Sequence, residues 1–289
     1  MARKNILRIL FTFLLLLTVA YIPAAISGQG CKAVYGVGSH RIDLATGSPG
    51  ELGLLKVLCS EFNKNHDTSF CWIKAGSGKS LKLLKEKKVD VILVHAPAAE
   101  KKAVEEGWAI NRTLVGSNEF YVVGPKDDPA NISSAKSVVD AYARIAKEKA
   151  KFFSRGDNSG TNKKELAIWK KAGIIPNGNW YIITKDFMMA TLLRADKEKG
   201  YFMTDSSTWV VGKNKIKNLK VLFRGDPFLI NVYHGLCQPD GATPGQPYAL
   251  EFLKFLTSEK GQSIIRNYGK EQYDEPLYHD AEYAKQYEH

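Results

Sequence analysis

Small hydroxyl residues and glycines stand together at three places where an apolar run gives way to an amphipathic one. These places are Thr46-Gly47-Ser48-Pro49-Gly50, Ala75-Gly76-Ser77-Gly78 and Ser154-Arg155-Gly156-Asp157-Asn158-Ser159-Gly160-Thr161. Such residues at the start of a helix leave backbone N–H groups and hydroxyls free, and the positive end of the helix dipole attracts anions. One such turn is also an ordinary helix cap. Three of them at the ends of strands in one α/β protein predict a single anion-binding crevice.

Arg155 makes the third turn the most specific of the three. Its planar guanidinium can bind two oxygens of one anion at once, and the neighbouring hydroxyls and N–H groups can donate to the others. Asp157 would repel an anion directly, so we expect it to pair with Arg155 and fix its orientation. The alternative is a surface salt bridge beside a capped helix. The predicted anion ligands are Thr46, Gly47, Ser48, Ser77, Arg155, Ser159, Gly160 and Thr161.

Other residues near these turns have roles that the sequence leaves open. Ser154 and Asp157 flank Arg155 and could act on it without touching the anion. His95 ends an apolar strand, where it could donate to the anion or form a local hydrogen bond. Bulky apolar residues follow Thr184-Lys185-Asp186 at the start of a helix, and these residues, Phe187, Met188 and Met189, could line or close the crevice or pack in the core.

Apolar β-rich runs alternate with amphipathic helical stretches, which predicts an α/β protein with mainly parallel sheets. The first series has strands at residues 41–45, 69–75 and 89–95, and helices at 50–65, 77–87 and 98–106. The second has helices at 138–149, 160–172 and 187–199, and strands at 151–154, 180–183, 201–204 and 220–223.

The order of these elements predicts two lobes and a hinge of two crossing segments. Strands expected within residues 113–124 end at a charged, proline-bounded turn, 125–129, which suits a crossing between lobes. A strand expected at 228–236 and helices at 248–256 and 258–267 would return to the first lobe. We therefore expect residues 32–123 and 227–289 in lobe 1 and residues 124–226 in lobe 2.

The first 28 residues are typical of a signal peptide. A basic start with Arg3, Lys4 and Arg8 precedes an apolar run over 9–20 and small residues at 24–28. We expect a periplasmic or extracellular protein of about 260 residues, which suits two domains. The net charge of +11 is reduced by three with the leader and would still help to collect anions. Export and the scattered lysines argue against nucleic acid as a partner.

Four cysteines in an exported chain predict a disulfide, and the sequence allows three pairings. We prefer Cys59 with Cys71, which would tie the first helix to the strand that follows it. Cys31 lies just beyond the expected cleavage point, but the residues before it are a poor lipidation signal, so a lipid anchor at Cys31 is not favoured. No cysteine or histidine spacing indicates a metal site, and no cofactor is expected.

At its turns the sequence resembles the periplasmic tungstate-binding proteins of ABC transporters, in the type II periplasmic binding protein superfamily. The matching stretches include 89–97, 120–125, 154–166, 173–174, 190–192, 225–227, 256–258 and 261–262. The resemblance implies a two-lobed periplasmic-binding-protein fold with a hinge of two crossing segments. It also implies a monomeric solute-binding protein that captures tungstate by lobe closure, delivers it to a membrane permease and catalyses nothing.

Two departures bear on the choice of anion. In that family the first turn is rich in threonine, and here only Thr46 and Ser48 match it, which keeps molybdate, phosphate and sulfate open. Phosphate binders, as the resemblance implies, carry an aspartate where this chain has His95. Phosphate keeps a proton near neutral pH and needs an acceptor, whereas tungstate and molybdate need donors only. The absence of that aspartate therefore favours the metal oxyanions.

Two other classes of function remain as alternatives. An exported hydrolase would use Ser154 or Ser159 with a histidine and a carboxylate, but the chain has no GxSxG motif. A basic interaction protein would bind polyanions in a salt-sensitive way and would not be stabilised by a small ligand.

Overall fold

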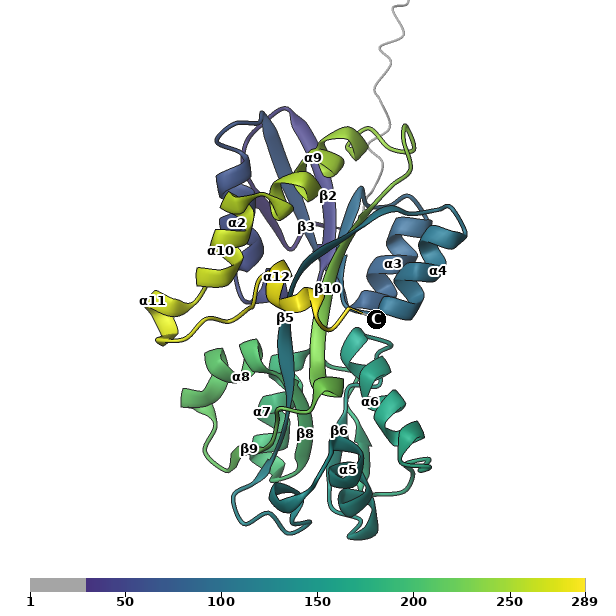
Figure 1. Ribbon diagram of the computed structural model, residues 1–289, viewed down its shortest axis with the longest axis vertical. Coiled ribbons are helices and arrows are strands. Elements are labelled where there is room, and N and C mark those ends of the chain that lie inside the picture. Colours follow the sequence, from purple (N-terminus) through teal and green to yellow (C-terminus); the bar gives the residue numbers. More distant parts are fainter. Residues whose placement is uncertain (1–29, 289) are drawn as a thin grey trace, which may run out of the picture.

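A computed structural model describes residues 30–288, so the predicted signal peptide, residues 1–28, lies outside the described residues. Within that range the strands form a continuous sheet in the order β1-β3-β2-β4-β10-β5-β8-β6-β7, and β9 pairs with β5. Figure 1 shows two α/β lobes, one above the other, with β5 and β10 running between them. The predicted two-lobed α/β fold is confirmed.

Lobe 1 is a mainly parallel sheet with helices on both faces. Its strands are β1 (Ala33–Tyr35), β2 (His40–Thr46), β3 (Thr68–Lys74) and β4 (Val91–Val94). Its helices are α1 (Ser48–Glu51), α2 (Leu54–Phe62), α3 (Ser77–Lys85), α4 (Pro97–Glu105), α9 (Gln246–Thr257), α10 (Glu259–Asn267), α11 (Lys270–Tyr273) and α12 (Ala281–Lys285). Figure 1 shows α2, α9 and α10 on one side of the sheet and α3 and α4 on the other.

Lobe 2 repeats this arrangement around a core rich in aromatic side chains, among them Tyr142, Phe152 and Trp169. Its strands are β6 (Phe152–Ser154), β7 (Tyr181–Ile183), β8 (Tyr201–Asp205) and β9 (Leu219–Phe223). Its helices are α5 (Val138–Lys147), α6 (Gly160–Lys171), α7 (Met188–Glu198) and α8 (Ser206–Gly212). The strand β6 lies between β7 and β8 and is parallel to both.

The chain passes between the lobes within one long strand, β5 (Ile110–Pro125), and returns through β10 (Ile230–Cys237). The first part of β5 pairs with β10, and the segment from Phe120 onward pairs with β8 and β9 of lobe 2. The turn at 125–129, which the sequence suggested as the crossing, therefore lies in lobe 2, where the N–H of Lys126 donates to the carbonyl of Asn218. Because β5 continues unbroken between the lobes, the crossing contains no turn that the sequence could indicate.

The disulfide joins Cys31 to Cys71, so the predicted pairing of Cys59 with Cys71 is wrong. Side chains alternate along β3, and Cys71 belongs to the core beneath α3 and α4. Cys59 on α2 is buried in the core on the opposite face of the sheet and is a free thiol. The two cysteines are separated by the sheet itself, whereas the segment before β1 brings Cys31 beside β3.

One helical prediction also needs correction, and a short helix was missed. The helix expected over 50–65 is two helices, α1 and α2, because Gly53 between them has a φ of 93° that a helix interior cannot accommodate. The short helix α8 was not predicted from the sequence.

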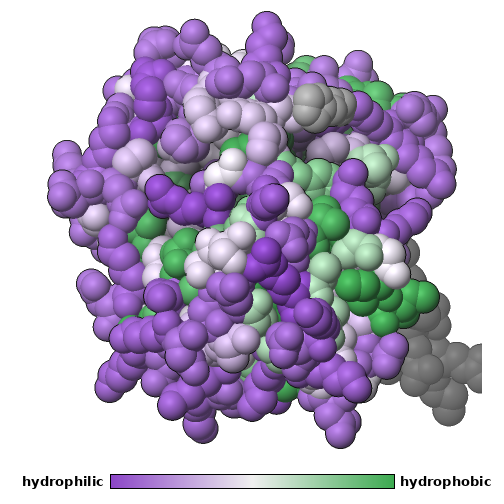
Figure 2. Space-filling model, turned by 60° about the horizontal axis from the view of Figure 1, so that its bottom comes forward, coloured by the Kyte–Doolittle hydropathy of each residue, from purple (hydrophilic) through white to green (hydrophobic). Residues whose placement is uncertain are grey.

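The surface is mostly hydrophilic at the lobe 2 end. Figure 2, which brings this end forward, shows hydrophilic residues over most of the face, with hydrophobic residues across its middle. None of the helices within residues 30–288 has both the length and the apolar character needed to span a membrane.

Candidate anion-binding site

A small pocket lies where the two lobes meet, and its cavity volume is about 10 Å³. This is room for about one water molecule and is far below the range of about 300–1,000 Å³ that is usual for ligand sites. It is lined by Gly47, Ser48, Pro49, Gly76, Ser77, Leu93, His95 and Tyr233 from lobe 1 and its strands, and by Arg155, Ser159 and Phe187 from lobe 2. The three predicted turns therefore meet at one pocket.

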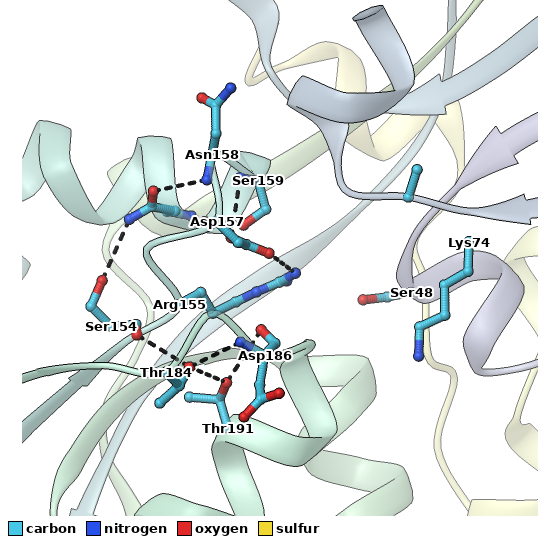
Figure 3. Close-up of polar contacts among 12 residues, drawn as sticks. Ser48, Lys74, Ser154, Arg155, Asp157, Asn158, Ser159, Thr184, Asp186 and Thr191 are labelled. Carbon is cyan, nitrogen blue, oxygen red and sulfur yellow. Dashed lines mark hydrogen bonds and ion pairs between the residues drawn. The ribbon is translucent and has the colours of Figure 1, made fainter. Parts of the chain in front are cut away.

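Arg155 is the charged residue of this pocket, and it is only 4% exposed. It follows β6 and reaches from lobe 2 toward the turn that carries Ser48, as Figure 3 shows. Its Nη2 donates to Asp157 Oδ2 at 2.6 Å, and Asp157 Oδ1 accepts the N–H of Ser159 at 3.2 Å. Asp157 thus holds the guanidinium in place. Nε of Arg155 is buried and meets no acceptor within residues 30–288, so the cation still has donor capacity to offer.

Serine hydroxyls from both lobes keep a hydrogen free for a ligand. Ser77 Oγ accepts the N–H of His95 at 3.2 Å, and Ser159 Oγ accepts the N–H of Asn162 at 3.2 Å. A hydroxyl that accepts one hydrogen bond can still donate another. Ser48 differs from them, because its Oγ donates to Asp205 Oδ2 at 3.4 Å across the lobe boundary.

The start of α6 contributes backbone donors next to Ser159. Asn162 and Lys163 direct their N–H groups to Ser159, which leaves the N–H groups of Gly160 and Thr161 at the positive end of the helix. The hydroxyl of Thr161 is buried and has no partner in the described part of the chain. Neither Gly160 nor Thr161 lines the pocket directly.

Two of the hydroxyls considered from the sequence are committed elsewhere. Thr46 donates to the carbonyl of Leu93 at 2.9 Å, and Ser154 donates to Glu165 Oε2 at 2.8 Å. Neither residue lines the pocket. The structure therefore places Thr46 beneath the site, where its hydroxyl does not face the pocket, and Ser154 behind Arg155.

His95 forms the local hydrogen bond that was one of its two predicted roles, and its ring also lines the pocket. Its Nδ1 lies 2.7 Å from Oδ1 of Asn231, an acceptor, so Nδ1 carries the hydrogen. Desolvation, together with the charges of Arg155 and Lys164, lowers the pKa of His95 to about 3. The imidazole is therefore neutral near pH 7.

The nearby carboxylates do not line the pocket. Asp157 is occupied by Arg155 and Ser159. Asp205 caps α8, where it accepts the N–H and the hydroxyl of Thr208, both at 2.8 Å. Burial raises the pKa of Asp205. The lining of the pocket thus supplies hydrogen-bond donors and a cation and no free carboxylate.

Of the bulky residues considered at the start of α7, Phe187 lines the pocket. Met189 instead packs near Gly212 of α8. Sequence reasoning missed Tyr233, Leu93 and Asp205, which no turn motif marks. They reach the site through the pairing of β4 and β10 and through the approach of the two lobes.

Glycines allow the lobes to approach closely around the pocket. A Cβ on Gly160 of lobe 2 would lie 2.4 Å from Cε1 of His95, and one on Gly78 of lobe 1 would lie 2.4 Å from the carbonyl of Asn158. A Cβ on Gly76 would lie 3.0 Å from Cβ of Ser159. The structure is therefore that of a closed crevice, in which any larger residue at these positions would separate the lobes.

Two lobes that close over a polar pocket about a pair of crossing strands define the solute-binding class of protein. The chain belongs to the periplasmic binding protein (PBP) superfamily, because the model described as "PBP superfamily domain" matches residues 27–260. It is 36% identical over 237 residues to the tungstate-binding protein TupA of Peptoclostridium acidaminophilum, with 81% of this chain and 82% of that protein covered.

Two solved structures agree with this assignment. The tungstate ABC transporter structure from Geobacter sulfurreducens is 36% identical, with a TM-score of 0.72 over 80% of this chain and 100% of that chain. The tungstate-binding protein TupA from Desulfovibrio alaskensis G20 is 32% identical, with a TM-score of 0.69 over 83% of this chain and 98% of that chain. The predicted resemblance is confirmed.

Proposed function

We propose that this protein captures tungstate between its lobes and presents it to the permease of an ABC transporter. Relatives at 36% and 32% identity are named for tungstate, and they match this chain over most of its length. The observation that carries the proposal is Arg155, a buried cation with an unused donor that faces a pocket lined by serine hydroxyls.

The chemistry of the lining favours a fully ionised oxyanion. Hydrogen phosphate must donate its proton to an acceptor, and a free carboxylate is the usual one. Asp157 and Asp205 are both engaged in other hydrogen bonds and lie outside the lining. A dianion without a proton needs only the donors of Arg155, Ser77 and Ser159.

Hydrolysis is not proposed for this site. A nucleophilic serine needs a base within hydrogen-bond reach whose pKa lies near the working pH, but Ser154 donates to Glu165, and the pKa of His95, lowered to about 3, makes its imidazole a weak base. The serines are better suited to donate to a bound anion than to attack a substrate.

We further propose that residues 1–28 direct export and that the mature protein acts as a monomer without a cofactor. The Cys31–Cys71 disulfide suits an oxidising compartment. A sulfur held in a disulfide cannot carry a lipid thioether, so the lipid anchor at Cys31 remains disfavoured. In this proposal, lobe 1 (32–123 and 227–289) and lobe 2 (124–226) close about β5 and β10.

Calorimetric titration of the mature protein, unfolded and refolded to remove bound ligand, tests the function. The titrants are tungstate, molybdate, phosphate and sulfate, and melting temperatures are measured in parallel, since a ligand of the folded state raises them. We expect the tightest binding for tungstate and its loss in Arg155→Ala. Arg194→Ala is the matched control, because Arg194 is an exposed arginine of the same lobe that pairs with Glu198.

The outcomes separate the alternatives. Tighter binding of molybdate would keep the site and change its ligand. Phosphate as the preferred ligand would contradict the argument from the missing carboxylate. No binding of any of the four anions would overturn the proposed function.

A further inference from the structure

An aromatic ring of lobe 2 contacts a lysine of lobe 1 at the edge of the pocket. Nζ of Lys74, at the end of β3, lies 4.1 Å from the ring centroid of Phe187. An ammonium within about 6 Å of an aromatic centroid is attracted by the electron-rich face of the ring. This contact exists only while the lobes are closed, because its two residues belong to different lobes.

Lys74 is held ready for this contact within its own lobe. Its Nζ forms an ion pair with Glu51 Oε1 of α1 at 2.8 Å, and its side chain is 25% exposed. Glu51 lies on the same short helix as Ser48, a pocket residue. The ammonium therefore keeps a fixed position on the wall of lobe 1, and closure does not have to order it.

Phe187 also contacts the cation at the centre of the site. Cζ of Arg155 lies 5.4 Å from the centroid of the same ring, and Phe187 lines the pocket. One side chain thus touches Arg155 within lobe 2 and Lys74 across the cleft. Figure 3 shows Arg155 on one side of the cleft and Lys74 with Ser48 on the other.

We propose that Phe187 and Lys74 form a latch that holds the closed state once the anion is bound. This inference rests on the proposed function, since a latch has a role only in a protein that closes over a ligand. The anion brings Arg155 and lobe 1 together, and the same movement places the ring of Phe187 against Lys74. The latch slows reopening, so it acts on the dissociation rate of the ligand.

A double-mutant cycle tests the latch. Phe187→Leu keeps an apolar side chain and removes the ring, and Lys74→Met keeps the alkyl chain and removes the charge. We expect each change to raise the Kd for tungstate about threefold to thirtyfold, mainly through faster dissociation in stopped-flow measurements. Because both remove the same contact, the double variant should bind about as weakly as the single variants.

Lys85→Met is the matched control. Lys85 lies 5.2 Å from the ring of Trp108 and pairs with Glu106 at 3.3 Å, but all three residues belong to lobe 1 and lie away from the pocket. Its tungstate Kd should be unchanged. Ligand-free melting temperatures of all variants show whether a change has damaged the fold.

The cycle also distinguishes a latch from simple electrostatics. If Lys74 acted only by its positive charge, Lys74→Met would weaken binding by the same factor whether residue 187 is Phe or Leu. Such an additive result would overturn the latch and leave the proposed function standing. Unchanged affinity in either single variant would overturn it as well. Absence of tungstate binding by the wild-type protein would overturn the proposed function and the latch with it.

Discussion

At the scale of single residues, the direction in which a hydroxyl donates decides whether it can serve the anion. Ser77 lines the pocket and accepts the N–H of His95, so its own hydrogen is available. Thr46 lies at the end of β2 and gives its hydrogen to the carbonyl of Leu93. The two residues have similar side chains and follow neighbouring strands, yet only one can donate to a ligand in this structure.

Ser77→Ala should therefore weaken tungstate binding, whereas Thr46→Val should lower only the stability of the fold. A hydrogen bond to a charged group contributes about 1.5–3 kcal/mol, so Ser77→Ala should raise the tungstate Kd about tenfold to a hundredfold. Thr46→Val should leave the Kd within about twofold but lower the free energy of unfolding by about 1–3 kcal/mol, because the carbonyl of Leu93 loses its donor. Calorimetric titration and urea unfolding measure the two quantities. A large loss of affinity in Thr46→Val would mean that its hydroxyl turns to the anion.

Glu165 supports the site from behind and titrates in an unusual range. It accepts hydrogen bonds from Ser154, Trp169 and Tyr181 and is 2% exposed. Desolvation raises its pKa from 4.5 to about 7. Between these pH values the unfolded chain has released a proton that the folded protein keeps. The stability contributed by Glu165 is therefore complete below about pH 4.5 and is lost as the pH rises through 7.

Glu165→Gln should remove this loss, because an amide keeps the neutral state at every pH. We expect the melting temperature of the variant minus that of the wild type to increase from pH 5 to pH 8, corresponding to up to about 3 kcal/mol. The low pKa of His95 acts in the opposite direction, but it is common to both proteins and cancels in the difference. A difference that stays constant with pH would show that Glu165 ionises normally in the folded protein.

At the scale of secondary-structure elements, the disulfide fixes the first ordered segment to lobe 1. Cys31 and Cys71 are 40 residues apart, and the disulfide holds the segment before β1 against β3. Removing a crosslink of this span should lower the free energy of unfolding by about 2–4 kcal/mol.

Thermal unfolding with and without a reductant measures that contribution. The double variant Cys31→Ser/Cys71→Ser should melt at the temperature of the reduced wild type and should not respond to reductant. The buried thiols of Cys59 and Cys237 are present in both proteins, so they do not affect the comparison. If the reductant leaves the wild type unchanged, this disulfide does not stabilise the fold.

Most elements could be predicted because their apolar residues alternate with the period of a strand or a helix. Strands β2, β3 and β6 and helices α3, α6 and α7 begin and end within a few residues of the predicted bounds. The predictions failed where contacts between residues far apart in the sequence determine the structure. Cys71 and Cys59 lie in cores on opposite faces of the lobe 1 sheet, so they cannot form a disulfide. The strand β5 crosses the hinge because its first half pairs with β10 and its second half pairs with β8 of lobe 2.

The residues of the site also divide into those that local sequence predicts and those that depend on long-range contacts. Gly47, Ser48, Ser77, Arg155 and Ser159 were predicted because each lies in a strand-to-helix turn, which is a local feature of the sequence. Tyr233 and Asp205 were not predicted as site residues, and Phe187 was considered only as one of three bulky side chains at the start of α7. They approach the pocket only after the lobes meet, and a single sequence carries no signal for that contact.

At the scale of the whole molecule, closure depends on how closely the two lobes can approach each other. Gly160 shows this most clearly, because it has no Cβ at the point where lobe 2 meets His95. It begins α6, where alanine is a better helix former than glycine. A Cβ there would nonetheless lie within 2.6 Å of Cε1, Nδ1 and the carbonyl oxygen of His95, closer than real Cβ contacts allow. Gly160→Ala should therefore leave each lobe folded and prevent complete closure.

Small-angle scattering with and without tungstate measures the closure of the lobes in the wild type and in Gly160→Ala. The radius of gyration of the wild-type protein should fall when tungstate is added, because the ligand shifts the population toward the closed state. In Gly160→Ala the fall should be smaller and the Kd should rise about fivefold or more, since forcing a methyl group into packed atoms costs about 1–3 kcal/mol. The ligand-free melting temperature should be unchanged or higher, because the substitution favours the helix. A variant that binds and compacts like the wild type would show that tungstate is held without the close approach of Gly160 to His95, and that the lobes have a looser closed state than the one described.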